Sequence, residues 1–170
     1  MYRETDFEAI GKMDAVSLEE MSSVSLMNRI DTKFVTTVEK LRLVLEDAFQ
    51  AGYRVCEISG QRLMAYASVY YDTPDLQMYT AHRNGKKTRQ KVRVRTYLID
   101  DEIFLEIKRK NNRGRTKKKR ISIPASSVMD FGAVPEASAF LEKKSWWKAS
   151  DLTPETTTDF CRFTLVNKAM

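Results

Sequence analysis

Cysteine, histidine, proline and glycine are all scarce in this sequence of 170 residues, which has two cysteines, one histidine, four prolines and six glycines. Cys56 and Cys161 lie far apart, with no CxxC pair and no neighbouring histidine, so neither a disulfide framework nor a zinc site is indicated. No apolar run approaches the ~20 residues that span a bilayer, and residues 1–12 lack a continuous apolar stretch. We therefore expect a cytoplasmic protein with neither a secretion signal nor a transmembrane segment.

The charge balance is positive and uneven. Lys and Arg outnumber Asp and Glu by 29 to 23, a formal net charge of +6, which favours polyanionic partners such as nucleic acid, nucleotides, phosphate chains or anionic lipid. The excess is concentrated in residues 83–120, where the only acids are Asp100, Asp101, Glu102 and Glu106. With 42% hydrophobic and 31% charged residues, the composition predicts one folded domain over residues 1–170.

Helical and strand-like patterns follow one another along the chain and predict an α+β fold. Capping boxes at Ser17-x-x-Glu20 and Thr36-x-x-Glu39 indicate helix starts, and the second is followed by apolar residues at helical spacing up to Gly52. Later runs alternate with period two across short turns, which favours an antiparallel meander. The expected helices cover residues 18–24, 38–51, 125–131 and 136–147, and a short helix or turn is expected over 74–84. The expected strands cover residues 28–36, 53–58, 62–72, 87–99, 102–110, 117–124 and 158–167, with 53–58 and 62–72 paired as a hairpin.

One predicted strand has an unusual charged face. Arg89, Lys91, Arg93 and Arg95 recur at every second residue, so all four side chains project from one side of an extended strand. If Ile99 and Glu102 flank a symmetric turn at Asp100-Asp101, the following strand adds further charges to this face. Two like charges about 5 Å apart repel by roughly 3 kcal/mol at an effective dielectric near 20. The expected pairs are Arg95 with Glu106, Arg93 with Lys108 and Lys91 with Lys110 on the charged side, and Val94 with Ile107 and Leu98 with Ile103 on the apolar side.

An anionic ligand with several phosphates would offset that repulsion, because phosphate oxygens accept charge-assisted hydrogen bonds from Arg and Lys. Lys118 and Arg120 extend the charged face to another strand, and Arg29 and Lys33 offer cations from the first one. Glu106 could orient Arg95 or help to hold a metal ion. The alternative is a solvated strand face, the usual fate of charge runs, although solubility does not require like charges to face each other across strands.

Six short runs occur in order along the chain: RIDTKF at 29–34, YYDTPD at 70–75, YTAHRNG at 79–85, KVRVRTY at 91–97, FLEIKRK at 104–110 and GRTKKKR at 114–120. As a set, in order and spacing, they resemble the VTC family of polyphosphate polymerase domains. This family belongs to the triphosphate tunnel metalloenzymes, in which antiparallel strands close into a tunnel lined with charged side chains and helices pack outside. The resemblance runs from about residue 18 to the end of the chain.

The resemblance implies a polymerase that transfers the γ-phosphate of ATP to a growing polyphosphate chain, with Mn²⁺ or Mg²⁺ as cofactor. Such phosphoryl transfer depends on positioning and charge neutralisation rather than on a nucleophilic side chain. By matching position, the expected tunnel residues are Lys33, Arg93, Arg95, Lys108 and Lys118, of which Arg93, Arg95 and Lys108 are expected to be catalytic. Glu106 is a candidate metal ligand from its place on the charged face. The expected phosphate-binding residues are Arg29, Lys33, Lys91, Arg93, Arg95, Lys108, Lys118 and Arg120.

Two departures from the family pattern affect these expectations. Related triphosphatases carry Glu-x-Glu-x-Lys on the first strand, whereas this chain has Arg29-x-Asp31-x-Lys33, and this difference favours the polymerase branch. Asp31 could bind a metal ion or pair with Arg29 or Lys33, and we prefer the ion pair. Family members also continue beyond Asn167 into strands with another arginine, a metal-binding glutamate and a late lysine. We therefore expect an incomplete barrel with an open sheet edge for a second copy or a partner chain, and an enzyme at the level of the family whose activity depends on those further strands.

Other functions remain open at this point. A triphosphatase or a non-catalytic polyphosphate-binding module would use the same tunnel. A nucleic-acid-binding domain fits the net charge and the Lys117–Arg120 run, but residues 83–96 contain no aromatic side chain for base stacking, so no nucleic acid is expected. His82 is expected at the surface, Trp146 and Trp147 against the barrel, and Tyr70 and Tyr71 in core and cross-strand positions.

Overall fold

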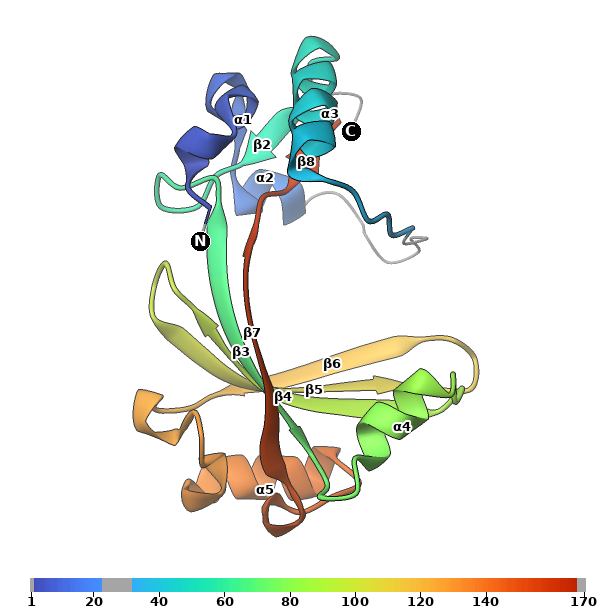
Figure 1. Cartoon of the computed structure of the whole chain (residues 1–170). Helices are drawn as coiled ribbons and strands as arrows, with labels where there is room; N and C mark the ends of the chain where they lie inside the picture. The colour runs from blue at the N-terminus through green and yellow to red at the C-terminus, as the bar shows by residue number, and fades with distance from the viewer. Residues whose placement is uncertain (1, 23–31, 168–170) are drawn as a thin grey trace. The chain divides into compact units, whose positions relative to one another are not determined.

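The computed structural model describes residues 2–22 and 32–167, which fall into two compact units (Figure 1). One unit is Ala65–Phe160, and the other combines the chain up to Met64 with the segment from Cys161 onward. Within the described ranges, no helix is both long and apolar enough to cross a lipid bilayer.

The unit that contains the N-terminus is built around a small mixed sheet with strand order β1-β2-β8, in which β1 and β2 are parallel and β2 and β8 antiparallel. Ile10 and Leu45, from two different helices, pack with Val55 of the sheet, and each is at most 1% exposed. The helices are α1 (Glu8–Lys12), α2 (Leu18–Ser22) and α3 (Val38–Gln50), and the strands are β1 (Ala15–Val16), β2 (Arg54–Cys56) and β8 (Leu165–Val166).

Helix starts in this unit follow the predicted capping chemistry. Ser17 and Glu20 form the expected box, with the Ser17 N–H donating to Glu20 Oε2 at 2.8 Å and the Glu20 N–H donating to Ser17 Oγ at 3.1 Å. The second cap lies one residue later than predicted: Thr37 is the N-cap of α3, and its hydroxyl accepts from the Lys40 N–H at 3.3 Å. Helix α3 ends before Gly52, whose φ of 73° suits glycine.

Two strand predictions in this unit were wrong. Residues 53–58 and 62–72 do not form a hairpin, because β2 pairs with β1 and β8 whereas the later strand belongs to the other sheet. The turn itself is present, with Ser59 and Gly60 at positive φ, but Arg62 then binds Glu57 and the carbonyl of Ile10, which draws the chain away from β2. Of the predicted strand 28–36, residues 28–31 lie outside the described residues and 32–36 form no strand.

The second unit has a five-stranded sheet in the order β6-β5-β4-β3-β7, in which β3 to β6 form an antiparallel meander and β7 is added beside β3. Within the part of the chain that the structure describes, this sheet does not close into a barrel, and β6 and β7 are its edges. The strands agree with the predicted runs, except that the last begins earlier and ends at Arg162. They are β3 (Met64–Asp72), β4 (Arg89–Tyr97), β5 (Glu102–Lys110), β6 (Thr116–Ser122) and β7 (Thr153–Arg162).

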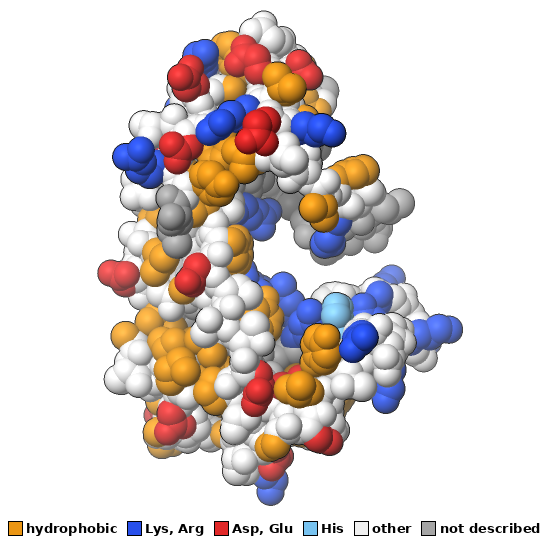
Figure 2. All heavy atoms as spheres, in the orientation of Figure 1, with side chains coloured by type: hydrophobic (Ala, Val, Ile, Leu, Met, Phe, Trp, Pro, Cys, Tyr) orange, Lys and Arg blue, Asp and Glu red, His pale blue; other side chains and the backbone are white. Residues whose placement is uncertain are grey.

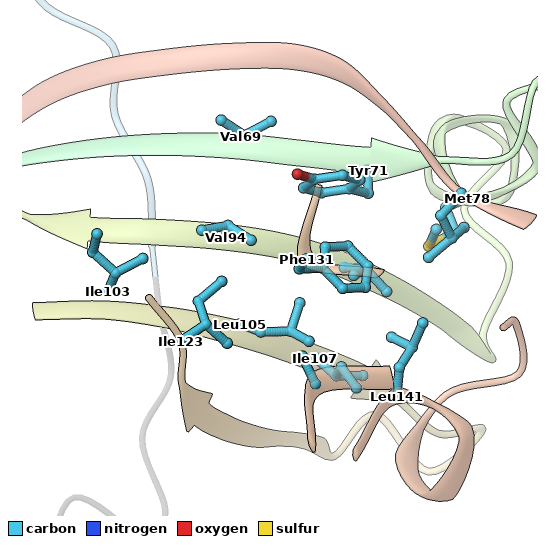
Figure 3. Close-up of a cluster of buried hydrophobic side chains, with 13 residues drawn as sticks. Val69, Tyr71, Met78, Val94, Ile103, Leu105, Ile107, Ile123, Phe131 and Leu141 are labelled. Atoms are coloured by element: carbon cyan, nitrogen blue, oxygen red, sulfur yellow. The ribbon is translucent and has the colours of Figure 1, made fainter. Parts of the chain in front are cut away.

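One face of this sheet carries the core of the second unit. Val92, Val94 and Leu105 are fully buried beneath Leu141 of helix α5 (Pro135–Lys144), and Phe131 packs edge to face on Tyr71 with ring centroids 4.7 Å apart. Figure 3 shows these side chains pointing toward one another from the strands and from the segment that follows β6. Residues 125–131 do not form the predicted helix, because the chain there makes short 3-10 turns at Ala125–Ser127 and Phe131–Ala133.

Asp72 at the end of β3 fixes the start of helix α4 (Gln77–Arg83). Its carboxylate accepts hydrogen bonds from the backbone N–H groups of Thr73, Met78 and Tyr79 at 2.8, 2.9 and 2.8 Å. A short helix is thus present in this region, but it begins at Gln77 rather than at Pro74, its N-cap residue is Leu76, and the buried Asp72 carboxylate accepts from its first turn. Helix α4 packs beside β4, at the end of the sheet where Lys91 lies.

Candidate functional site

Cationic side chains from three neighbouring strands share the face of the second sheet that is opposite the core. Period-two alternation places the valines of β4 in the core and its arginines on the other side, as the sequence predicted. Figure 2 shows Lys and Arg side chains gathered in this part of the molecule, near the single histidine. We call these residues the cationic face: Lys91, Arg93 and Arg95 of β4, Lys108 of β5, and Lys118 and Arg120 of β6.

The predicted cross-strand register was wrong by two residues. The loop between β4 and β5 comprises four residues, 98–101, rather than a two-residue turn at Asp100-Asp101 flanked by Ile99 and Glu102, and Asp101 has a φ of 52°. The observed partners on the charged side are Arg93 with Glu106, Lys91 with Lys108 and Arg89 with Lys110. The apolar side pairs Val92 with Ile107, Val94 with Leu105 and Thr96 with Ile103.

Glu106 lies at the centre of the cationic face and is fully buried. Arg93 donates to its Oε2 through Nε at 2.8 Å and Nη2 at 2.5 Å, and Lys118 Nζ donates to its Oε1 at 3.0 Å. Burial raises the pKa of Glu106, but the hydrogen bonds from Lys118 and Arg93 outweigh it and hold the pKa below its usual value. Glu106 is therefore an anion, and it orients Arg93 rather than the predicted Arg95.

The other cations of this face lie close to one another. Lys91 and Lys108 are cross-strand partners, as are Lys108 and Lys118. Burial, together with the nearby charges of Arg93, Arg95 and Lys118, lowers the pKa of Lys108 to about 8. The pKa of Arg95 is lowered as well, first by burial and then by Arg93. One buried carboxylate does not neutralise this group of cations, so the face carries a positive potential.

Aromatic side chains hold Arg95 in place. Its guanidinium lies 5.3 Å from the ring centroid of Tyr66 and 5.1 Å from that of Phe160, and its Nε donates to Ser68 Oγ at 3.1 Å. The two rings are stacked on each other with centroids 5.1 Å apart. Cation–π contacts of this kind favour a fixed guanidinium orientation. The sequence analysis missed these residues because they come from β3 and β7, far from the basic run.

A second arginine of the cationic face stacks in the same way. Arg120 lies 4.1 Å from the ring centroid of Phe104, and Phe104 contacts Tyr97 edge to face. Tyr97 in turn contacts Tyr66, so that an aromatic row crosses the sheet at one end of the cationic face. Residues 83–96 contain no aromatic side chain, so the rings beside the cationic face come from β3, β5, β7 and the last residue of β4.

Comparison with known families gives a match over most of the chain. The family model for the VTC domain matches residues 28–169. This chain belongs to the VTC-domain family. No curated protein sequence matches it at a significant level. Among solved structures, an X-ray structure from Vibrio parahaemolyticus described as a "putative adenylate cyclase" is similar at a TM-score of 0.44 with 11% identity, over 79% of this chain and 59% of that chain.

The structure brings together most of the residues that the resemblance to VTC domains selected. Six of the eight expected phosphate-binding residues form the cationic face. Of the other two, Lys33 is exposed and belongs to the other compact unit, and Arg29 lies outside the described residues. His82 is exposed at the end of α4, as expected, Trp147 packs on the core, and Trp146 is 45% exposed beneath Arg109.

The divalent cation that the VTC family implies would take carboxylate or phosphate oxygens as ligands. Among the described residues, no group of three or more His, Cys, Asp or Glu side chains comes together. Glu106, the candidate metal ligand, already accepts hydrogen bonds at both carboxylate oxygens from Arg93 and Lys118. A divalent ion needs several oxygen ligands, so the geometry of this part of the chain supports an ion-pair role for Glu106.

Proposed function

We propose that this VTC domain binds the triphosphate of ATP, and polyphosphate, along the cationic face of β4, β5 and β6, and that it transfers the γ-phosphate of ATP to a growing polyphosphate chain. The observation that supports the proposal is the set of six cations around one buried carboxylate. Family membership adds the reaction class, which the resemblance implied.

The cationic face is suited to phosphates in a chain. A polyphosphate presents oxygens at regular short intervals, and an arginine fork or an ammonium can each donate to them. Arg95 is pre-organised by its aromatic neighbours and Arg93 by Glu106, so little side-chain entropy is lost when an anion binds. A bound phosphate also stabilises the protonated form of Lys108.

The same groups would assist phosphoryl transfer electrostatically. The transferred phosphoryl carries charge on its oxygens in the transition state, and fixed cations stabilise that charge without reorganisation. We propose Arg93, Arg95 and Lys108 as the catalytic residues, since they lie at the centre of the face beside Glu106. A divalent cation, Mn²⁺ or Mg²⁺, would neutralise phosphate charge when bound.

Binding and turnover are tested separately. Titration calorimetry with ATP and with tripolyphosphate measures binding, and Arg95→Gln/Lys108→Gln is expected to weaken both by tenfold or more. Incubation with ATP and Mn²⁺ or Mg²⁺, followed by gel analysis of chain length, measures polymerisation. Single-stranded RNA is the control for general polyanion binding, and RNA binding as tight as that of tripolyphosphate would contradict the proposal.

A second candidate is a polyphosphate-binding module without turnover. The observation in its favour is the lack of a metal-ligand cluster among the described residues. It predicts tight tripolyphosphate binding with neither chain growth nor release of inorganic phosphate, whereas a triphosphatase would release phosphate without chain growth. Pairing of an open sheet edge with a second copy or partner chain stays a prediction that sedimentation analysis would test.

A further inference from the structure

We propose that a pocket beside the cationic face binds the base and ribose of a nucleoside triphosphate, while its phosphates lie on that face. This inference rests on the proposed function and adds a nucleoside subsite to it. The pocket has a volume of about 660 Å³ and lies within the second unit, between strands β3, β4 and β7 and helix α4. Small-molecule sites in proteins have volumes of this order, and a nucleoside fits within it.

Two residues join the pocket to the cationic face. Tyr70 lines the pocket, and its hydroxyl accepts a hydrogen bond from Arg93 Nη1 at 3.0 Å. Lys91 also lines the pocket and is the cross-strand partner of Lys108. A ligand in the pocket would therefore continue onto the cationic face without a break. The ligand class that matches this arrangement has a planar uncharged end and a polyanionic end.

The pocket walls themselves do not suit phosphate. Among the described residues that line it, Lys91 is the sole Lys or Arg, and Asp72 and Glu155 contribute carboxylates. Burial lowers the pKa of His82, and the charges of Lys91, Arg89 and Lys110 lower it further, so its imidazole is uncharged at neutral pH. A polyphosphate chain that extended from the cationic face into this pocket would meet few hydrogen-bond donors, and two carboxylates would repel it.

The same walls do suit a nucleoside. Tyr79 is 56% exposed at the pocket and is not part of the core cluster, which leaves an aromatic face for a base. Leu76 adds apolar surface, and Thr156 and Thr158 of β7 supply hydroxyl groups for hydrogen bonds to ribose or base edges. An uncharged imidazole at His82 can donate through one nitrogen and accept through the other.

The test compares two ligands that differ only by the nucleoside. Titration calorimetry of the full chain with ATP and with inorganic tripolyphosphate is expected to show tighter ATP binding. Tyr79→Ala is expected to weaken ATP binding about tenfold and leave tripolyphosphate binding within twofold, because stacking on one aromatic ring is lost. Tyr79→Phe keeps the ring and is expected to retain ATP affinity. Trp146→Ala is the control, because it removes an exposed aromatic side chain near Arg109, on the core side of the sheet.

A second readout needs no variant. His82 is the only histidine, so its imidazole gives a single set of NMR signals, and nuclear Overhauser contacts to the base or ribose protons of ATP are expected. Equal affinities for the two ligands, no effect of Tyr79→Ala and no such contacts would overturn the nucleoside site and leave phosphate binding intact. Failure of both ligands to bind would overturn the proposed function and this inference with it.

Discussion

Arg93 donates two hydrogen bonds to a single carboxylate oxygen of Glu106, through Nε at 2.8 Å and Nη2 at 2.5 Å. Lys118 donates to the other oxygen at 3.0 Å, so the fully buried Glu106 has a cation at each oxygen. This ion-pair group ties β4, β5 and β6 together on the side of the sheet that faces away from the core. It also leaves Lys91, Arg95, Lys108 and Arg120 without a buried counter-charge among the described residues.

Removal of the central carboxylate should destabilise the protein. Glu106→Gln leaves Arg93 buried without its anionic partner, and we expect a loss of about 3–5 kcal/mol in the free energy of unfolding. Tripolyphosphate should raise the melting temperature of this variant more than that of the wild type, since it replaces the missing negative charge. Glu102→Gln, an exposed acid on the same strand, is the control and should change stability by less than about 0.5 kcal/mol. Equal melting temperatures for Glu106→Gln and wild type would contradict this account.

Phosphate affinity should depend on pH through Lys108. Its pKa is lowered from 10.5 to about 8 in the folded chain, so the side chain begins to lose its proton near pH 8, and a bound polyanion reverses this loss. Calorimetry of tripolyphosphate binding at pH 8–9, in buffers of different ionisation enthalpy, should show net proton uptake. Affinity should fall as pH rises through 8. The Lys108→Arg variant, which stays charged, should lose both effects, and unchanged proton uptake in it would assign the titration to another group.

The lowered pKa of Lys108 also makes the stability of the folded chain depend on pH. The pKa of Lys108 in the folded chain lies below that in the unfolded chain, so between pH 8 and 10.5 the unfolded chain binds more protons. This group therefore contributes a rise in stability as pH increases from about 8 toward 10.5. Chemical denaturation of wild type and Lys108→Met across this range should show the rise in the wild type alone. The same pH dependence in both proteins would argue against a lowered pKa of Lys108 in the folded chain.

The rings around Arg95 should matter for binding although they touch no phosphate in this account. Phe160→Leu keeps apolar volume but removes one cation–π contact, 5.1 Å from the guanidinium to the ring centroid, and we expect about three- to tenfold weaker tripolyphosphate binding. Phe160→Tyr retains the ring and should bind as the wild type does. If Phe160→Leu binds normally with unchanged stability, the aromatic neighbours do not position Arg95.

The residues of the cationic face were predicted from the sequence more accurately than the strand register around them. Alternation along β4 was sufficient to place Arg93 and Arg95 opposite the valines, because side chains in a strand have a strict period of two. The register was wrong because it depends on loop length, and a four-residue loop with Asp101 at positive φ leaves little trace in sequence. As a result, Glu106 was assigned to Arg95 rather than to Arg93.

Tertiary contacts account for the other differences. Phe160 reaches Arg95 only because β7 adds to the sheet beside β3, a long-range pairing that local patterns do not encode. Strand β2 was recognised but paired with the wrong neighbour, since its partners β1 and β8 are two-residue strands without a detectable alternation. Lys118 and Arg120, which the charge pattern added to the predicted face, lie on it in β6, while Arg29 lies outside the described residues.

The most direct test of the cationic face uses one strand as its own control. Lys118 and Arg120 of β6 belong to the cationic face, whereas Lys117 and Lys119 alternate with them on the other side, and all four are exposed. The measurement is the calorimetric affinity for tripolyphosphate of Lys118→Ala/Arg120→Ala against Lys117→Ala/Lys119→Ala, which remove the same net charge. We predict a loss of tenfold or more for the first pair and less than about twofold for the second. Equal losses for the two pairs would show attraction by overall charge and contradict a phosphate-binding face.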